Sequence, residues 1–338
     1  MLSKVIVLLH GAYAGSAYEE IFSSMLKVQS NIDKVVISTY IADQEKTKAM
    51  CKKYESIFDI KYIFTKDLFN PGYFNINRQI VTVRRGLERI EDGKIVVKLR
   101  NDQWCNFRKL FNILKNSYVV CQNTKIISTN CFTRKDRFYH PSDMFLCAKK
   151  ELLYEYYSMP LQLKSHDNYQ LDMLRKMEES NEKFESVLVS PESELFKNYL
   201  IVKGWKLKYT QEDSYQAIKK YIMLINTWDI NLKWNKQRNA FLPAKTIILP
   251  YRFNLEPFEG APSEQAECYS RSDFYGHKTV RDRVFILFSN FVFDLKYKSS
   301  SRKMRRLINR IIMKLPRKWR NCVTKTTIGA SVKAFINS

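Results

Sequence analysis

The hydrophobic pattern of the first part of the chain alternates between short apolar runs and longer amphipathic stretches. Runs rich in Val, Ile and Leu at 4–11, 33–40 and 59–67 have the length and composition of buried strands. The stretches between them, 18–29 and 46–58, keep the spacing of helices. Strands that alternate with helices predict a mostly parallel α/β sheet.

A fourth unit of the same kind follows. After a Pro-Gly turn at 71–72, the apolar positions of residues 75–90 fall on one helical face. The next strand, 94–99, is apolar and β-branched, yet it runs into Arg100 and then Asp102. Ligands of open parallel sheets bind beyond the carboxyl ends of the strands, so Asp102 is expected at a ligand site.

The rest of the chain shows a weaker pattern. Residues 106–116, 149–158 and 209–228 are predicted helices, and 245–253 is a predicted strand. The stretch 282–295 is so apolar and aromatic that we expect it to be a core element. No internal repeat or low-complexity linker separates these segments.

Composition narrows the class of protein. The 338 residues are 45% hydrophobic, enough for a large core, and the 7 Cys include no CxxC pair. We therefore expect neither a disulfide framework nor a structural zinc, and a reducing cytoplasm as the setting. No apolar run approaches the ~18 residues of a membrane span, and the sequence contains no GxGxxG, GxxxxGK[ST] or GxSxG motif. Dinucleotide-binding, P-loop and α/β-hydrolase proteins are thus not expected.

The positive charge is concentrated at the C-terminus. After Asp294 there are 13 Lys and Arg and no acid, more than half of the net charge of +23. Apolar positions of 304–315 repeat with helical spacing, which predicts a basic amphipathic helix on an anionic membrane surface. Docking of this helix on the protein's own core, or nucleic acid binding, are the alternatives. The expected membrane contacts are Arg305, Arg306, Arg310, Lys314 and Trp319.

An acid at the end of the fourth strand suits a nucleotide-sugar transferase of the GT-A type. In such enzymes a carboxylate holds the donor diphosphate through a divalent cation, Mn or Mg. Arg100 is expected to bind phosphate directly, and Asp102 to hold the metal. The alternative is that Asp102 caps the next helix or pairs with Arg100.

Several motifs in order resemble the WavE family of lipopolysaccharide-synthesis proteins. These are "VIVLLHGAY", "VVISTY", "NINRQIVTVRRGLERIEDGKIVVKLRNDQ", "FYHPSDMFLCAKKEL" and "SPESELFKNYL", within residues 4–202. The resemblance implies a GT-A-like glycosyltransferase that builds lipopolysaccharide core, O-antigen or capsule. Its expected fold is a Rossmann-type mixed, mostly parallel sheet flanked by helices, with a helical basic C-terminal extension.

The resemblance also implies a donor site. Residues 77–79 begin a helix, whose positive N-terminus suits phosphate or sugar hydroxyls, although ordinary helix-start residues would look alike. The sequence departs from the family at His10-Gly11, where Gln-Gly is expected, and at Thr39-Tyr40, where Thr-Trp is usual. The residues expected to contact the donor or its phosphates are His10, Gly11, Thr39, Asn77, Arg78, Gln79, Lys98, Arg100 and Asp102.

Catalytic residues are expected after the fourth strand. Asp143 is expected to be an acceptor hydrogen-bond partner, a metal ligand together with His140, or a base, unless it is only a turn residue after Pro141. His140 is expected to contact the acceptor. An inverting transferase needs a carboxylate that takes the acceptor proton, and family matching points to Glu192. Ser190 and Pro191 make Glu192 equally good as a plain helix-start residue.

These inferences combine into one hypothesis. Residues 1–205 form the nucleotide-sugar-binding core, 206–295 complete the acceptor side of the same domain, and 296–338 form the membrane-associating tail. The partners are a nucleotide-sugar donor, a lipid-linked or saccharide acceptor and the inner face of the cell membrane, with no nucleic acid. The alternatives are a non-catalytic basic protein that binds polyanions or nucleic acid, and a sugar-nucleotide nucleotidyltransferase.

Overall fold

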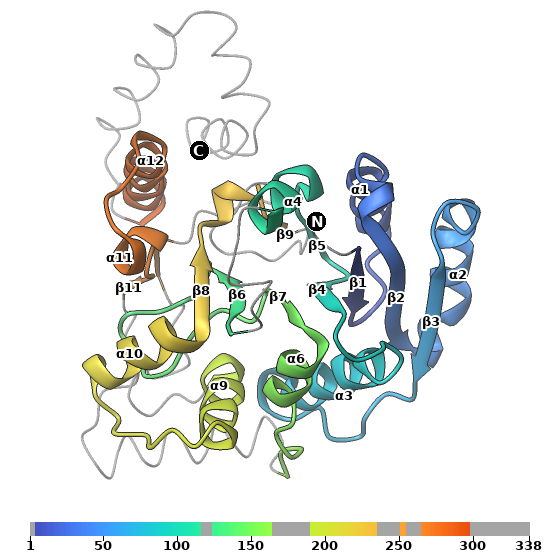
Figure 1. The fold of residues 1–338 in the computed structure, drawn as a ribbon, viewed down its shortest axis with the longest axis horizontal. Coiled ribbons are helices and arrows are strands. Elements are labelled where there is room, and N and C mark those ends of the chain that lie inside the picture. The colour runs from blue at the N-terminus through green and yellow to red at the C-terminus, as the bar shows by residue number, and fades with distance from the viewer. Residues whose placement is uncertain (1–3, 116–123, 164–189, 235–250, 255–264, 298–338) are drawn as a thin grey trace, which may run out of the picture.

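The computed structural model describes residues 4–115, 124–163, 190–234, 251–254 and 265–297 (Figure 1). Its strands are β1 (Val5–His10), β2 (Ile32–Tyr40), β3 (Ile60–Thr65), β4 (Ile95–Arg100), β5 (Gln103–Trp104), β6 (Ile126–Thr129), β7 (Phe145–Lys149), β8 (Ile222–Ile225), β9 (Lys233–Trp234), β10 (Arg252–Asn254) and β11 (Gln265–Glu267). Its α-helices are α1 (Ala17–Leu26), α2 (Gln44–Cys51), α3 (Ile76–Leu87), α4 (Phe107–Lys115), α6 (Lys150–Tyr156), α9 (Pro191–Val202), α10 (Gln211–Tyr221), α11 (Arg271–Tyr275) and α12 (Val280–Tyr297). Short 3₁₀ turns are η1 (Gln29–Asn31), η2 (Ile41–Asp43), η3 (Lys52–Tyr54), η4 (Tyr73–Asn75) and η5 (Thr227–Asp229).

Seven strands form one sheet in the order β3-β2-β1-β4-β7-β6-β8. The pairs β3-β2, β2-β1, β1-β4 and β6-β8 are parallel, whereas β7 is antiparallel to both of its neighbours. The mixed, mostly parallel sheet flanked by helices is thus confirmed. One result is that β1, β2 and β4 end, and β7 begins, at the same edge of the sheet.

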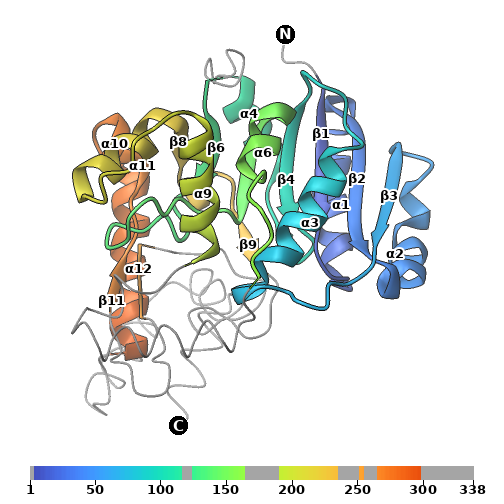
Figure 2. The same ribbon diagram turned by 90° about the horizontal axis from the view of Figure 1, so that it is seen from below.

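Helices cover both faces of the sheet (Figures 1 and 2). One core lies under α1 and α4, and the other lies under α3, α6, α9 and α10. Strands β1 and β4 contribute side chains to both cores in alternation, which explains their almost unbroken apolar sequences.

Gly86 allows α3 to lie close to β1. A methyl group at this position would collide with the side chain of Leu8. The close approach fixes α3 with its N-terminus at the carboxyl edge of the sheet, next to the end of β1. The loop before α3 is also constrained, because Phe74 and Asn75 both have positive φ angles (48° and 63°).

Three expectations for the elements need correction. The predicted helix 209–228 ends at Tyr221, and its β-branched continuation becomes β8, because that segment pairs with β6. Within 46–58 the α-helix stops at Cys51 and a 3₁₀ turn follows. Residues 282–295 are not simply a core element, since several apolar side chains of α12 are exposed. Two predicted segments lie outside the described residues. They are the basic tail that includes 304–319, and residues 245–250 of the predicted strand.

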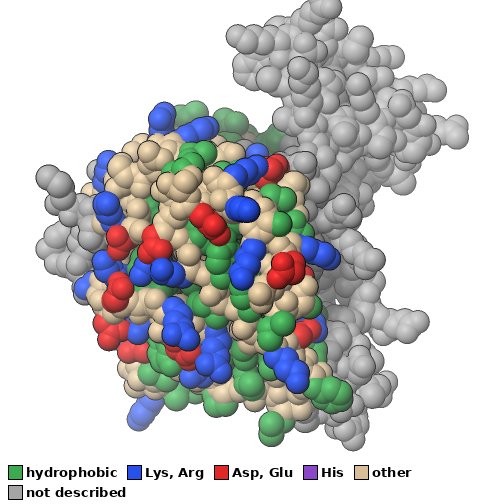
Figure 3. Space-filling view, turned by 90° about the vertical axis from the view of Figure 1, so that its right-hand side faces the viewer, with side chains coloured by type: hydrophobic (Ala, Val, Ile, Leu, Met, Phe, Trp, Pro, Cys, Tyr) green, Lys and Arg blue, Asp and Glu red, His purple; other side chains and the backbone are tan. Residues whose placement is uncertain are grey.

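One face of the described part of the molecule carries charges of both signs, unlike the tail. On the face shown in Figure 3, basic and acidic side chains are interspersed. No described helix has the length and hydropathy to cross a membrane.

Candidate functional site

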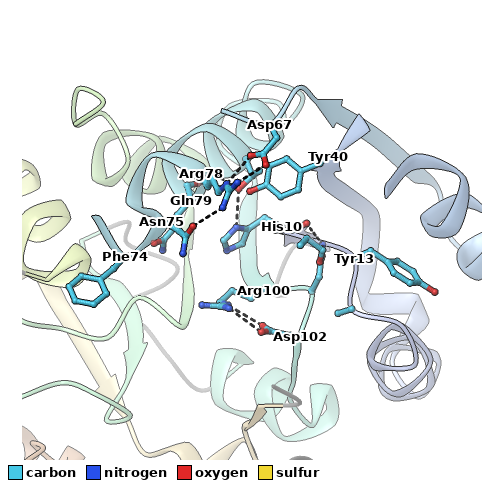
Figure 4. A pocket seen from close by; sticks show the side chains of 15 residues that line it. His10, Tyr13, Tyr40, Asp67, Phe74, Asn75, Arg78, Gln79, Arg100 and Asp102 are labelled. Atoms are coloured by element: carbon cyan, nitrogen blue, oxygen red, sulfur yellow. Dashed lines mark hydrogen bonds and ion pairs between the residues drawn. The ribbon is translucent and has the colours of Figure 1, made fainter. Parts of the chain in front are cut away.

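A cavity of about 680 Å³ opens at the carboxyl edge of the sheet (Figure 4). Its walls come from the ends of β1, β2 and β4, from the loop after β1, and from the start of α3. The lining residues are His10, Gly11, Ala12, Tyr13, Ala14, Tyr40, Asp67, Phe74, Asn75, Arg78, Gln79, Thr82, Arg100, Asn101 and Asp102. Five residues predicted to contact the donor are thus brought together with Asp102: His10, Gly11, Arg78, Gln79 and Arg100.

Arg100 is the central cation of this cavity. Its Nε and Nη2 donate to the two oxygens of Asp102, each at 3.0 Å, and its guanidinium lies over the ring of Trp234. Burial opposes the charge on Arg100, but Asp102 outweighs it and raises the pKa of Arg100, with smaller contributions from Asp143 and Glu192. The Arg100 side chain is still 38% exposed, and among the described residues none accepts a hydrogen bond from its Nη1. This nitrogen is available to an anionic ligand.

A second ion pair lies across the cavity. Arg78 donates from Nε and Nη2 to both oxygens of Asp67, at 2.8 and 2.6 Å, and from Nη1 to Asn75 Oδ1 at 2.9 Å. The hydrogen bonds from Arg78 lower the pKa of Asp67. Burial and the neighbouring Asp67 raise the pKa of Tyr40 to about 12, so its hydroxyl is protonated at neutral pH. The start of α3 thus offers a fixed guanidinium to the cavity, and the end of β2 offers a phenol.

His10, at the end of β1, is neutral. Burial, followed by Lys98 and Arg100, lowers the pKa of His10 well below its usual value. Its Nδ1 lies 3.3 Å from Thr82 Oγ1, and that hydroxyl already donates to the carbonyl of Arg78 at 2.8 Å. Nδ1 must therefore carry the proton. Nε2 is left as an acceptor with no hydrogen-bond partner in the described part of the chain.

The loop after β1 is turned by Gly11 and held in place by Asn101. Gly11 adopts a φ of +104°, which favours glycine, and turns the chain away from the strand. Asn101 donates from Nδ2 to the carbonyls of Gly11 and Ala12 at 2.6 and 3.2 Å. The polar end of β4 thereby shapes the end of β1.

Asp143 lies behind the cavity lining. Gln79 donates a hydrogen bond to Asp143 Oδ2, and Gln79 Nε2 also lies 3.3 Å from the Tyr157 hydroxyl. Lys98 is fully buried and donates to the main-chain carbonyl of Asp143. Burial lowers the pKa of Lys98 to about 8, while Asp143 partly offsets this effect. Gln79 therefore connects Asp143 to the cavity.

Glu192 starts α9 close to Asp143. The Ser190 hydroxyl caps the helix by accepting from Ser193 N, as expected, and the Glu192 side chain is 23% exposed. Burial and the negative charge of Asp143 raise the pKa of Glu192 to about 7. His140 Nε2 lies 3.8 Å from Glu192 Oε2, and burial lowers the pKa of His140 well below its usual value. The structure thus brings Asp143, His140 and Glu192 into one cluster.

Three predicted donor residues do not line the cavity. Asn77 is bound to the main chain of Asn70 and Gln162, so it tethers a loop. Lys98 and Thr39 are fully buried. The five residues predicted to contact a membrane lie outside the described residues.

The surroundings of Asp102 do not fit a preformed metal site. Its Oδ1 accepts from Arg100, and its Oδ2 accepts from both Arg100 and Trp234 Nε1 at 2.9 Å. Among the described residues no three His, Cys, Asp or Glu side chains are grouped to hold a metal ion. The pairing of Asp102 with Arg100, the alternative weighed from the sequence, is what the structure contains.

Sequence reasoning missed several of these residues. Asn101 stands between two predicted site residues, so its position was a usable signal. Trp234 reaches Asp102 because β9 pairs with β5, a contact across 132 positions that no local pattern reveals. Tyr157, beside Gln79 and Lys98, was hidden in a predicted helix.

Comparison with known proteins gives one family match. The family model described as WavE lipopolysaccharide synthesis matches residues 62–232, about half of the chain. Among curated proteins, none matches this chain.

Similar solved structures are distant. A 4-diphosphocytidyl-2C-methyl-D-erythritol synthase from Anaerococcus prevotii is 15% identical, with 63% of this chain and 96% of that chain covered and a TM-score of 0.32. Mouse xyloside xylosyltransferase 1 is 11% identical, with 66% and 85% covered and a TM-score of 0.34. HddC from Yersinia pseudotuberculosis is 11% identical, with 51% and 86% covered and a TM-score of 0.32. Similarity this low establishes no shared activity.

Proposed function

Because this chain belongs to the WavE lipopolysaccharide synthesis family, we propose that it is a glycosyltransferase. It transfers a sugar from a nucleotide-activated donor to a saccharide or lipid-linked acceptor of surface polysaccharide, in the manner of a GT-A enzyme. The observation that carries the proposal is Arg100, a guanidinium at the carboxyl edge of the sheet whose Nη1 is available in a cavity of about 680 Å³.

The cavity supports donor binding in two ways. The diphosphate binds at Arg100, where the guanidinium is held in place by Asp102 and Trp234 and its Nη1 is available to a phosphate oxygen. His10 Nε2 accepts a hydrogen bond from a hydroxyl or N–H group of the donor, because the ring is neutral and its other nitrogen is occupied by Thr82. Arg78 and Tyr40 supply further donors on the opposite wall.

Transfer breaks the bond between the anomeric carbon and the diphosphate oxygen while the acceptor hydroxyl oxygen attacks that carbon. The negative charge that develops on the departing diphosphate is stabilised by Arg100. Glu192, with its pKa raised to about 7, takes the acceptor proton, because a base works best when its pKa lies near the working pH. Asp143 keeps that pKa high and holds Gln79 at the cavity wall.

The experiment is a thermal-shift and calorimetric screen of UDP, GDP, ADP, CDP and CMP, each with EDTA and with manganese. At least one nucleotide is expected to stabilise the protein, and its binding is expected to persist in EDTA because Arg100, not a metal at Asp102, meets the phosphates. Arg100→Lys is expected to weaken binding at least about tenfold, since lysine cannot keep the two hydrogen bonds to Asp102 and contact a phosphate with a third nitrogen.

The matched control is Arg85→Lys, on the exposed side of α3 with 63% of its side chain accessible. Its affinity is expected to equal that of the unchanged protein. If no nucleotide binds, the transferase proposal is wrong. If nucleotides bind only with manganese, the assignment of the phosphates to Arg100 is wrong and Asp102 becomes a metal ligand.

A further inference from the structure

Helix α12 turns an apolar face to solvent. Five large side chains of this helix are exposed over 36% or more of their surface, and helical periodicity places all five on one side. They are Val280 (79%), Val284 (57%), Leu287 (67%), Phe288 (36%) and Phe291 (45%), here termed the α12 stripe. An amphipathic helix of a monomeric protein normally buries such a face.

The opposite face of α12 is fixed to the protein by apolar contacts of Ile286 and Phe285 and by a buried carboxylate. Asp282 is buried and accepts hydrogen bonds from Asn226 Nδ2 and Trp228 Nε1, both at 2.9 Å. Ser289 is buried on the same face. Rotation of the helix to bury the stripe would leave the Asp282 carboxylate and its partners unsatisfied, which is costly inside a protein. The outward position of the α12 stripe is therefore built into the fold.

Cations border the stripe. Arg281 and Arg283 fall on its two flanks by helical spacing, and both are exposed. Arg281 also lines a cavity of about 440 Å³ together with Lys109, Arg271 and the single acid Asp229. The surface beside the stripe thus carries an excess of positive charge.

We propose that the α12 stripe is a docking surface for an anionic lipid bilayer. Its apolar side chains enter the boundary between headgroups and acyl chains, and the bordering cations contact the lipid phosphates. The chain that follows α12, residues 298–338, adds 12 Lys and Arg and no acid. The proposal does not depend on transferase activity.

Charge favours lipid over the other occupants. A second copy of the chain carries the same cations beside its stripe, so pairing of two stripes would add no negative charge to neutralise them. The chain's own segment 304–315 carries four cations. Either arrangement places like charges together, whereas an anionic bilayer neutralises them.

The test is co-sedimentation of the full chain with vesicles of phosphatidylcholine, alone or with phosphatidylglycerol. The unchanged protein is expected to sediment with the anionic vesicles only. The double variant Leu287→Glu/Phe291→Glu is expected to bind them at least about tenfold more weakly. The matched control is Ile201→Glu/Val202→Glu at the end of α9, where the side chains are 61% and 52% exposed, and it is expected to bind normally.

Arg283→Glu is a second variant that alters only an exposed flank, and it is also expected to weaken binding. Circular dichroism and the unfolding temperature establish that each variant is folded. Equal sedimentation of the stripe variant and the unchanged protein would overturn the proposal. Unchanged sedimentation with a lower unfolding temperature would also overturn the proposal, because it would show that another part of the chain covers the stripe. A change in oligomeric state without a change in sedimentation would overturn it as well.

Discussion

Glu192 and Asp143 are two carboxyl groups that influence each other beside the candidate site. Burial and Asp143 raise the pKa of Glu192 to about 7, and Arg100 is close enough to sense both charges. A proton on Glu192 is thus exchanged near neutral pH, which is the property needed by a residue that accepts a proton from a sugar hydroxyl.

The raised pKa also predicts how Glu192 affects stability. A carboxyl group whose pKa is about 7 in the folded protein and 4.5 in the unfolded chain favours folding fully below pH 4.5. This contribution is lost as the pH rises through 7, because the folded protein resists ionisation. Glu192→Gln is therefore expected to unfold at nearly the same temperature as the unchanged protein at pH 5, and several degrees higher at pH 8. Thermal unfolding across this pH range measures the difference.

Glu194→Gln is the matched control, because Glu194 lies in the same helical turn and is equally exposed but pairs with Lys197. This variant is expected to show no gain at pH 8. A constant offset for Glu192→Gln at all pH values would contradict the raised pKa, whatever the effect on activity.

At the scale of elements, the contact between α3 and β1 decides where the helix presents Arg78 and Gln79. Gly86→Ala places a methyl group against Leu8, and overpacking of this kind costs about 1–3 kcal/mol. The variant is expected to unfold at a lower temperature and to bind nucleotide more weakly, since the start of α3 moves. Denaturant unfolding and calorimetry measure the two effects.

Arg85→Ala is the control for Gly86→Ala, because it changes the neighbouring residue on the exposed side of α3. Its stability is expected to change by less than about 0.5 kcal/mol. The double variant Leu8→Ala/Gly86→Ala is expected to lose less free energy of unfolding than the two single variants lose together, because the smaller side chain makes room for the methyl group. Additive effects would show that the two sites do not touch.

The elements also show what a sequence can predict. The units from β1 to β4 follow from local period and composition, because β1, β2 and β4 contain apolar runs that are buried on both faces and the helices each bury one face. The change from α10 to β8 does not, since "YIMLI" suits either structure and only pairing with β6 selects the strand. The same holds for the site: Arg100 and Asp102 were found from their place at a strand end, whereas Trp234 comes from a distant strand.

At the scale of the whole molecule, charge is distributed unevenly. Basic and acidic side chains alternate on the face shown in Figure 3, whereas residues after Asp294 are basic without a single acid. A protein that bound polyanions with its entire surface would not need this asymmetry. We therefore expect the chain to attach to an anionic membrane through its C-terminal part. The cavity at the sheet edge is then left for a small anionic ligand.

This asymmetry predicts which cations matter for membrane binding. Each Lys or Arg near an anionic bilayer contributes about 1 kcal/mol. Replacement of Arg305, Arg306, Arg310 and Lys314 by Gln is therefore expected to weaken sedimentation with phosphatidylglycerol vesicles strongly. The same number of changes at the exposed Lys46, Lys48, Lys52 and Lys61 lowers the net charge equally and serves as the control. Equal losses in both variants would mean that total charge, not the position of the basic segment, governs binding. Nucleotide affinity is expected to stay unchanged in the lysine variant, because none of its four residues is among the described residues that line the cavity at the sheet edge.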